Sequence, residues 1–139
     1  QGVSSAASDV YKRQKLHRAT VTEADLDYVG SITIDAKLMK EANIHPYEMV
    51  QITNLSNAAR WKTYALPAEA GGGKICLNGP PAHLFSKGDL VIILSMAEMS
   101  EEEIQDLKPK VVFMDENNQI TNIEEHDVAQ MIADVQNVE

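Results

Sequence analysis

The sequence lacks several features by which whole classes of protein are recognised. It has one cysteine, Cys76, in 139 residues, which excludes an internal disulfide framework and a multi-cysteine zinc site. No stretch is long, apolar and uncharged enough to predict a membrane-spanning helix. We expect Cys76 to be a small buried hydrophobe in a strand, and we predict a reducing, cytoplasmic location with no membrane partner.

Clusters of basic and of metal-ligating residues are also missing. No basic stripe with interleaved aromatic residues is present, so nucleic acid is not a predicted partner. The four histidines show no close pairing, and no metal site is predicted. The glycine run at 71–74 lacks the spacing of a phosphate-binding loop and the helix that would follow it, so it is expected to be a hairpin loop.

The net charge of −9 is unevenly distributed. Residues 98–139 hold 12 acidic and two basic residues, whereas the chain before them is close to neutral. A neutral body can still hold a local cationic pocket for an acidic substrate. The terminal stretch 124–139 has helical spacing of its apolar residues, and a peripheral helix or a frayed tail is expected there.

Short strand-like segments fill most of the chain from Lys15 onward. Many short strands between closely spaced turn signals, with one or two short helices, predict a mainly β protein folded as a small closed barrel. Asp35 is a predicted N-cap for a short helix that carries Leu38, Met39 and Ala42 on one face. The expected strands cover residues 15–25, 31–34, 45–56, 57–68, 75–79, 89–99 and 111–115, with 45–56 and 57–68 forming a hairpin.

Three parts of the chain are predicted. Residues 1–14 are small and polar, lack a starting methionine, and are expected to be a leader outside the fold, either non-native or disordered. Residues 15–114 form the predicted β-barrel domain, and residues 115–139 an acidic C-terminal extension. Ser100 and Glu103 have the spacing of a capping box, which predicts a turn of helix before the last strand.

The Gly30-Ser31 pair interrupts an alternating apolar run, and two interpretations compete. It can be a bulge or tight bend, because both residues weaken a strand. Alternatively, the serine hydroxyl can attack the carbonyl of the glycine before it, since glycine permits the unusual backbone that this needs. The resulting ester can eliminate to dehydroalanine and hydrolyse with loss of ammonia. The product is a pyruvoyl group, a ketone that condenses with amines as a cofactor does.

Four segments together resemble one enzyme family: KLHRATVTEADLDYVGSITID, RWKTYALPAE, ICLNGPPAH and GDLVIILSMAEM. They keep the order and spacing found in the aspartate 1-decarboxylases, and the resemblance runs from Lys15 to about Val112. It implies a double-psi β-barrel, a homotetramer and self-cleavage between Gly30 and Ser31. It also implies a covalent pyruvoyl group made from Ser31, without pyridoxal phosphate or metal. The implied reaction converts L-aspartate to β-alanine and carbon dioxide for pantothenate synthesis.

The resemblance also implies roles for side chains early in the chain. Lys15 matches the family's lysine beside the substrate carboxylate, and His17 matches a histidine that lines the site and aids maturation. Tyr28 matches the tyrosine that borders the cleavage site. Without the resemblance, Lys15 and His17 would be two residues of one solvated strand face, and Tyr28 an ordinary strand aromatic.

The remaining implied roles belong to two later motifs. Arg60 matches the arginine that holds a substrate carboxylate, a task suited to its planar guanidinium. Thr63 matches the threonine that stabilises the oxyanion during self-cleavage, and Tyr64 the proton donor after carbon dioxide leaves. Strand alternation puts Thr63 and Tyr64 on opposite faces. A bend, or two sites that face each other across a subunit boundary, would have to reconcile their roles.

Asn78 and Gly79 match the turn that supplies amide groups to the pyruvoyl group and the substrate. Pro80 and Pro81 stand where alanines are common in the family, and proline has no N–H to donate. A maturation factor is a possible partner. Two alternatives stay open: an uncleaved precursor, and a non-catalytic barrel that serves as a binding module.

Overall fold

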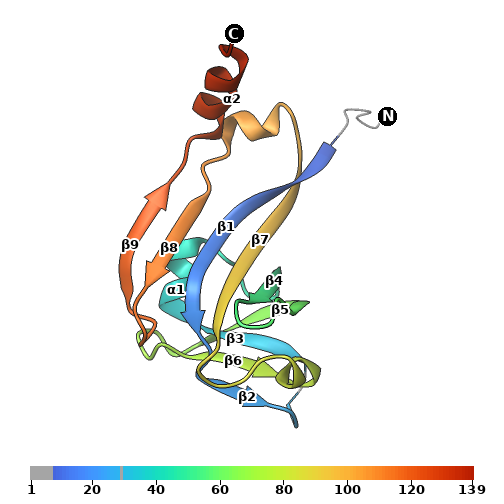
Figure 1. The fold of residues 1–139 in the computed structure, drawn as a ribbon, viewed down its shortest axis with the longest axis vertical. Helices are drawn as coiled ribbons and strands as arrows, with labels where there is room; N and C mark the ends of the chain where they lie inside the picture. The colour runs from blue at the N-terminus through green and yellow to red at the C-terminus, as the bar shows by residue number, and fades with distance from the viewer. Residues whose placement is uncertain (1–7, 29) are drawn as a thin grey trace.

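The structure is a computed structural model that describes residues 8–28 and 30–139. Strands dominate this part of the chain, and the predicted class, a mainly β protein with a small barrel and short helices, is confirmed (Figure 1). The strands are β1 Ser8–Thr20, β2 Glu23–Asp25, β3 Ser31–Asp35, β4 Met49–Asn54, β5 Arg60–Ala68, β6 Ile75–Asn78, β7 Leu90–Ser100, β8 Lys110–Met114 and β9 Ile120–Glu125. The helices are α1 Ala36–Ala42 and α2 Val128–Gln136, with 3₁₀ turns η1 Pro80–His83 and η2 Glu103–Asp106.

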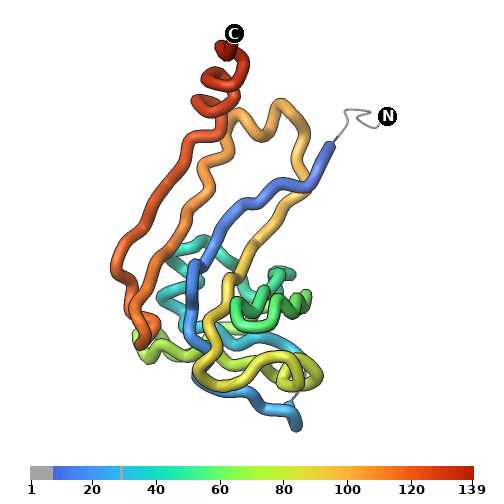
Figure 2. The backbone as a smooth tube through the Cα atoms, viewed as in Figure 1, coloured from blue at the N-terminus to red at the C-terminus, as the bar shows by residue number. Residues whose placement is uncertain are grey.

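The strands join in one mixed sheet of order β2-β6-β3-β5-β4-β7-β1-β8-β9. β4 and β5 form the predicted antiparallel hairpin, and β1 pairs antiparallel with β7 over most of its length. β3 runs parallel to β5 on one side and antiparallel to β6 on the other. The sheet curls, so that β2, β3 and β6 cross beneath the long β1–β7 ribbon (Figures 1 and 2).

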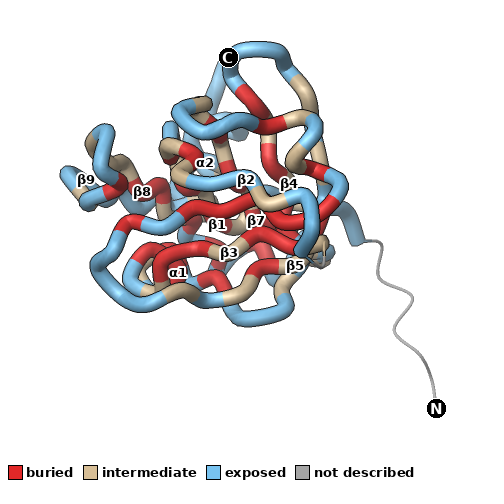
Figure 3. The backbone as a smooth tube through the Cα atoms, turned by 90° about the horizontal axis from the view of Figure 1, so that it is seen from below, coloured by how far each residue is buried: buried red, intermediate tan, exposed pale blue. Residues whose placement is uncertain are grey.

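The core forms on the inner face of the curled sheet because alternate residues of each strand point inward. Ile32 and Ile34 of β3, for example, are fully buried, as are Ile52 of β4 and Ile93 of β7. The buried residues concentrate along β1, β3 and β7, whereas β9 lies at the edge with exposed residues (Figure 3). Helix α1 covers part of this core with Leu38, Met39 and Ala42.

The short helix α1 begins where the sequence predicts. Asp35 is its N-cap, and the carboxylate accepts the backbone N–H of Lys37 at 2.9 Å. The same carboxylate accepts the N–H groups of Gly71 at 2.9 Å and Gly73 at 2.8 Å. A buried carboxylate that accepts several N–H groups is well satisfied, and Asp35 therefore joins the β3–α1 turn to the glycine run.

The glycine run at 71–74 is not a hairpin loop, and this expectation is wrong. It connects β5 to β6, but β3 lies between these two strands in the sheet. The run therefore crosses the end of β3, where Asp35 holds it. The spacing of the two strands in sequence could not reveal that a third strand would lie between them.

The N-terminal boundary of the fold also differs from the expectation for residues 1–14. Residues 8–14 belong to β1, where Ser8 pairs with Ser100 and Gln14 with Ser95. Gln14 is buried, and its side-chain oxygen accepts the N–H of Lys110 at 2.7 Å. Polar composition conceals this strand because backbone pairing does not depend on apolar side chains. Residues 1–7 lie outside the described residues.

Residues 115–139, which we call the C-terminal arm, contain β9 and α2. β9 pairs antiparallel with β8, and α2 has no buried residue, which confirms the peripheral helix. The capping box before the arm forms, because the Ser100 N–H donates to Glu103 at 3.0 Å and the Glu103 N–H to the Ser100 hydroxyl at 3.2 Å. Over residues 8–28 and 30–139, no helix combines the length and apolar character needed to cross a membrane.

One buried residue fastens the C-terminal arm to the barrel. Asn118, in the β8–β9 turn, donates to the carbonyls of Thr20 and Gly73 at 2.8 Å each and accepts the Thr20 N–H at 2.8 Å. Asn118 adopts a left-handed backbone with φ of 58°, which asparagine tolerates better than most residues. The arm thereby connects the end of β1 with the loop that precedes β6.

Candidate active site

Ser31 begins β3 and is buried at 2% exposure. It pairs across the sheet with Asn78 of β6, whose side-chain amide donates to the Ser31 hydroxyl at 3.1 Å. The same amide nitrogen donates to the Thr33 hydroxyl at 2.9 Å, and the side-chain oxygen of Asn78 accepts the Cys76 thiol at 3.1 Å. These contacts fix the orientation of the Asn78 amide and hold the Ser31 hydroxyl in a defined place.

Gly30 and Gly79 lie against each other with no room for a side chain on Gly79. Gly79 has φ of 79°, and a Cβ built on it would lie 2.9 Å from the Gly30 Cα and 2.9 Å from the Tyr28 carbonyl oxygen. Only glycine combines this backbone with so close an approach. The Gly79 N–H donates to the Asp25 carbonyl at 2.7 Å. The close approach is on the Gly79 side, because a Cβ on Gly30 would make only ordinary contacts, 3.6 Å to the Pro80 Cδ and 4.0 Å to the Asn78 carbonyl oxygen.

The two prolines after Gly79 fit the turn that follows it. Pro80 is the first residue of η1, where a helix has no use for a backbone N–H, and Pro81 is buried. The Pro80 ring lies near Gly30, since its Cδ is 3.6 Å from the position of a Gly30 Cβ. Pro80 therefore lies beside the Gly30-Ser31 bond, and neither proline has a backbone N–H to donate there.

Tyr64 and Ser31 lie on the same face of the sheet. β3 and β5 run parallel with Ile32 opposite Ala65, and both of these residues are buried in the core. The preceding residues, Ser31 and Tyr64, therefore share the opposite, outward face. We call this outward face of β6, β3 and β5 the site face; it carries Asn78, Ser31, Tyr64 and Arg60.

Thr63 lies on the other side of β5, as strand alternation predicts. It is 7% exposed and opposite the buried Val50 of β4, and the β4–β5 register runs without interruption from Arg60 to Tyr64. Thr63 and Tyr64 therefore lie on opposite faces of β5, and the β4–β5 register shows no shift between them.

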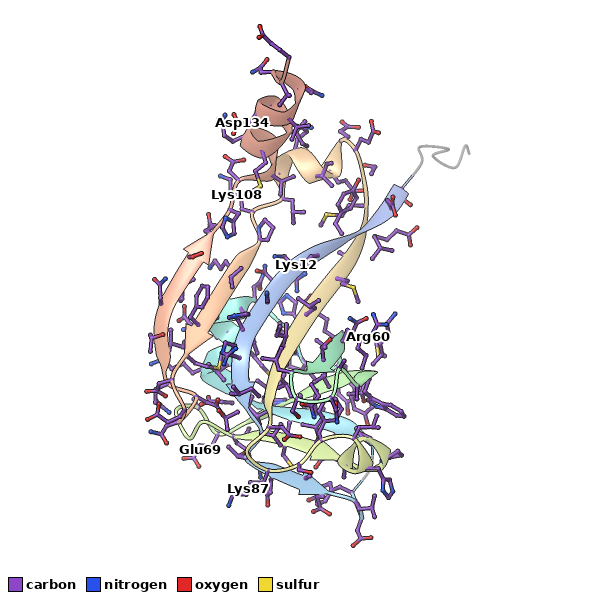
Figure 4. All side chains as sticks on the ribbon, viewed as in Figure 1. Lys12, Arg60, Glu69, Lys87, Lys108 and Asp134 are labelled. Carbon is purple, nitrogen blue, oxygen red and sulfur yellow. The ribbon has the colours of Figure 1, made fainter. Side chains whose placement is uncertain are left out.

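Arg60 begins β5 and is exposed on the site face. It lies at the outer end of the β4–β5 hairpin, across the molecule from Glu69 beyond the other end of β5 (Figure 4). Tyr28, close in sequence to the Gly30-Ser31 bond, is 66% exposed. Arg60 and Tyr28 are therefore open to solvent, whereas Ser31 and Asn78 are buried.

Lys15 and His17 do not join the site face within one chain. Both lie on β1, and the strands β5, β4 and β7 separate β1 from β3 in the sheet. Their neighbour Leu16 points into the core, so Lys15 and His17 point outward. Outward faces on distant strands of a barrel point in different directions, and one protomer does not bring these residues to Ser31.

Burial shifts the pKa of two side chains, His17 on β1 and Cys76 on β6. Desolvation, followed by the charges of Lys15 and Arg18, lowers the pKa of His17 below its usual value. The His17 ring contacts Phe113 edge-on at 5.4 Å, and its Nδ1 has no hydrogen-bond partner among the described residues. Burial, followed by the charge of Glu23, raises the pKa of the Cys76 thiol. The expectation of a buried cysteine in a strand is confirmed.

Sequence reasoning missed three residues that surround the site. Thr33 and Cys76 hold Asn78, and Tyr47 stacks on Tyr64 with ring centroids 5.4 Å apart and an interplanar angle of 11°. The two-residue spacing of Ser31 and Thr33 was a usable signal for a shared face. The sequence predicts the β4–β5 hairpin but not its register, and the contact between Tyr47 and Tyr64 depends on that register. Within the described ranges, no group of His, Cys, Asp and Glu could hold a metal ion.

Comparisons with known proteins identify the family and the enzyme class of the chain. The family model described as "Aspartate decarboxylase" matches residues 9–121, and the chain belongs to this family. It is accordingly a decarboxylase, an enzyme of the carbon–carbon lyase class.

Curated relatives cover nearly the same part of the chain. Proteins named "Aspartate 1-decarboxylase" from Clostridium acetobutylicum and Thermoanaerobacter pseudethanolicus are 50% and 52% identical, over 83% and 80% of this chain and 91% and 95% of their own. The protein of that name from Campylobacter jejuni subsp. doylei is 53% identical over 82% of this chain and 92% of its own.

Proposed function

We propose that this chain decarboxylates L-aspartate to β-alanine and carbon dioxide, after self-cleavage between Gly30 and Ser31 converts Ser31 to a pyruvoyl group. The observation that carries the proposal is the site face. There the buried Ser31, which follows the glycine that Gly79 packs against, shares one surface with Asn78, Tyr64 and Arg60. Family membership supports the same activity. The proposed metabolic role of the product is pantothenate synthesis.

Self-cleavage begins with attack of the Ser31 oxygen on the Gly30 carbonyl carbon. A C–O bond forms, the C–N bond breaks, and the freed nitrogen takes up a proton. Asn78 holds the hydroxyl for this attack at 3.1 Å. Thr63, on the strand next to β3, has a hydroxyl suited to donate a hydrogen bond to the oxyanion that develops on the Gly30 carbonyl. Loss of the Ser31 α-proton then releases Gly30 as a carboxylate, and hydrolysis releases ammonia.

The environment of Ser31 fits a pyruvoyl group. The side chain is buried at 2% exposure, and a polar amide lies beside it, so the ketone would be shielded from bulk water and held by a donor. This group supplies an electron-withdrawing carbonyl that reacts with the substrate amine and accepts the electrons left when carbon dioxide departs.

The other residues of the site face bind the substrate and transfer the proton. Arg60 is suited to hold a substrate carboxylate with two parallel hydrogen bonds. Tyr64 shares the outward side with Ser31, and its hydroxyl is suited to donate the proton that replaces the lost carboxylate. Arg60 and Tyr64 lie on the same face of β5, four residues apart.

Lys15 and His17 support the proposal that the site is completed by a second copy of the chain. They point outward from β1, with three strands between β1 and β3, so a role at the active site would place them at the site of a neighbouring copy. In a homotetramer, each copy of the chain would contribute its Lys15 and His17 to the site of a neighbouring copy. The cytoplasmic location and the need for a maturation factor stay predictions.

An intact mass spectrum of the purified, denatured protein tests the self-cleavage. We expect one fragment that ends at Gly30 and one that starts at position 31 and is lighter than a serine start by one ammonia. Retained serine would mean cleavage without cofactor formation. A single uncut chain, before and after incubation with cell extract, would contradict the proposal.

Assays of carbon dioxide release then test the substrate. We expect turnover of L-aspartate and much slower turnover of L-glutamate, whose extra methylene displaces the carboxylate from Arg60. Equal rates with both amino acids would contradict aspartate as the preferred substrate. A mature, fully cleaved protein that releases carbon dioxide from neither would contradict the proposed reaction.

A further inference from the structure

Tyr47, in the turn between α1 and β4, combines exposure with an unusual backbone. Its side chain is 72% exposed, and its φ is 67°. A bulky aromatic residue seldom adopts this left-handed conformation, which costs on the order of 1 kcal/mol or more and persists only where surrounding contacts hold it. The contacts of Tyr47 should therefore explain why this exposed residue keeps its left-handed backbone conformation.

The ring of Tyr47 contacts the ring of Tyr64. The two rings are nearly parallel, with an interplanar angle of 11° and centroids 5.4 Å apart. This is within the range of offset-stacked aromatic pairs, which attract each other beyond simple burial of area. Tyr64 itself is half-buried, so the Tyr47 ring covers part of a residue that would otherwise be open to solvent.

Backbone hydrogen bonds tie Tyr47 to the residue after Tyr64. The Tyr47 N–H donates to the Ala65 carbonyl at 2.7 Å, and the Ala65 N–H donates to the Glu48 carbonyl at 3.0 Å. The Tyr47 N–H and the Glu48 carbonyl are thus paired with the strand that carries Tyr64, while the Glu48 N–H closes the turn on the His45 carbonyl at 3.0 Å. The position of the Tyr47 ring over Tyr64 follows from this pairing.

Glu48 anchors the turn that carries Tyr47. Its carboxylate accepts Arg13 at 2.8 and 3.0 Å and the N–H of His45 at 3.1 Å, and it also accepts the Ser95 hydroxyl. Arg13 lies at a register shift of the β1–β7 ladder, between Lys12 and Gln14. The anchor therefore reaches from β1 and β7 to the turn, and it opposes movement of the Tyr47 backbone toward an unstrained conformation.

We propose that Tyr47 is a positioning residue that holds the Tyr64 side chain in the orientation needed for proton donation. This inference rests on the proposed function, in which Tyr64 is the proton donor. A tyrosine on an open strand face has several accessible rotamers. The stacked Tyr47 ring blocks those that would swing the Tyr64 ring across the turn, so the Tyr64 hydroxyl stays on the Ser31 side.

The test compares Tyr47→Gly with Tyr47→Phe in the full-length cleaved enzyme. Glycine removes the ring but adopts a positive φ without strain, so the turn is preserved. We expect Tyr47→Gly to lower kcat about 5- to 10-fold, the size of effect that loss of one aromatic pair can produce, with KM for aspartate changed less than two-fold. Tyr47→Phe keeps the stack and is expected to restore kcat to within about two-fold of the parent.

A second readout does not depend on turnover. The chain has four tyrosines, so a protein labelled with 3-fluorotyrosine gives a small set of ¹⁹F resonances, and Tyr64→Phe assigns that of Tyr64. These spectra are recorded in the Ser31→Ala background, which forms no pyruvoyl group. We expect Tyr47→Gly to shift the Tyr64 resonance through loss of the ring current, and Tyr47→Phe to leave it close to its original position.

The outcomes separate this inference from the proposed function. Unchanged kcat in Tyr47→Gly, with Tyr64→Phe inactive, would overturn the positioning role and leave the proposed function intact. Full turnover in Tyr64→Phe would overturn both. An unchanged Tyr64 resonance in Tyr47→Gly would overturn the stacking on which the inference depends, whatever the kinetics.

Discussion

The site face and the C-terminal arm differ in how far their polar residues are buried. On the site face, Ser31 and Asn78 are buried and bonded to each other, and Gly79 leaves no room for a methyl group. In the arm, β9 and α2 expose nearly all of their side chains, and Asn118 is the one buried residue of the arm among those described. Substitutions of the proposed site residues should therefore disturb chemistry, and substitutions in the arm should disturb stability or nothing.

Replacement of Ser31 by Ala is the most severe test of this comparison. Alanine has no hydroxyl to attack the Gly30 carbonyl, so we expect no cleavage in the mass spectrum and no carbon dioxide from aspartate. The fold should persist, because the side chain becomes only slightly smaller. Carbon dioxide release by this variant at a measurable rate would contradict the assignment of Ser31.

Replacement of Gly79 by Ala tests the close approach of Gly79 to Gly30. The new Cβ would lie 2.9 Å from the Gly30 Cα, and alanine would also be strained at φ of 79°. We expect a loss of roughly 3 kcal/mol in unfolding free energy and slower cleavage, measured by denaturant titration and timed mass spectra. The control is Gly71→Ala, which also has a positive φ but meets nothing within 4 Å; equal losses in both variants would sink the close-approach argument.

Replacement of Arg60 by Ala should separate maturation from turnover. Because Arg60 is exposed, cleavage should continue without it. Loss of a charge-assisted contact with the substrate carboxylate should lower kcat/KM for aspartate about 10- to 100-fold. Lys62→Ala, also exposed on the outward face of β5, is the matched control. Unchanged kinetics in Arg60→Ala would remove this residue from the site.

Replacement of Asn118 by Gly tests the attachment of the arm. Glycine tolerates φ of 58° but loses the three hydrogen bonds to Thr20 and Gly73. We expect a loss of about 2 kcal/mol in unfolding free energy, seen by denaturant titration, with kcat of the cleaved enzyme unchanged. The exposed neighbour gives the control, because Asn117→Ala should be neutral. A large loss of kcat would mean that the arm contributes to the chemistry.

The smallest expected effect is a change in the pH dependence of stability. Burial opposes the charge of Glu48, but hydrogen bonds from Ser95, His45 and Arg13 outweigh it and hold the pKa of this carboxyl below its usual value. The unfolded chain therefore binds a proton first as the pH falls, and stability is lost from the usual glutamate range down through the lowered pKa. We expect Glu48→Gln to flatten this acid-side slope in unfolding titrations. An unchanged slope would mean that the Arg13–Glu48 pair contributes nothing to it.

Much of the local structure was predictable because it depends on nearby residues. The Asp35 cap, the apolar face of α1, the β4–β5 hairpin and the Ser100–Glu103 capping box are all confirmed. Features that depend on distant partners were not predictable. The strand at residues 8–14 exists because β7 pairs with it, and the loop at 71–74 crosses β3 because that strand enters between β5 and β6.

At the site, strand alternation is enough to predict which groups share a face, and Thr63 and Tyr64 lie on opposite faces for that reason. What lies beside each group depends on the tertiary structure: the β3–β5 register, with Ile32 opposite Ala65, puts Ser31 and Tyr64 on one face, and the turn before β4 puts Tyr47 on Tyr64. Alternation is a local property of the backbone, whereas register is set by which distant side chains pack into the common core.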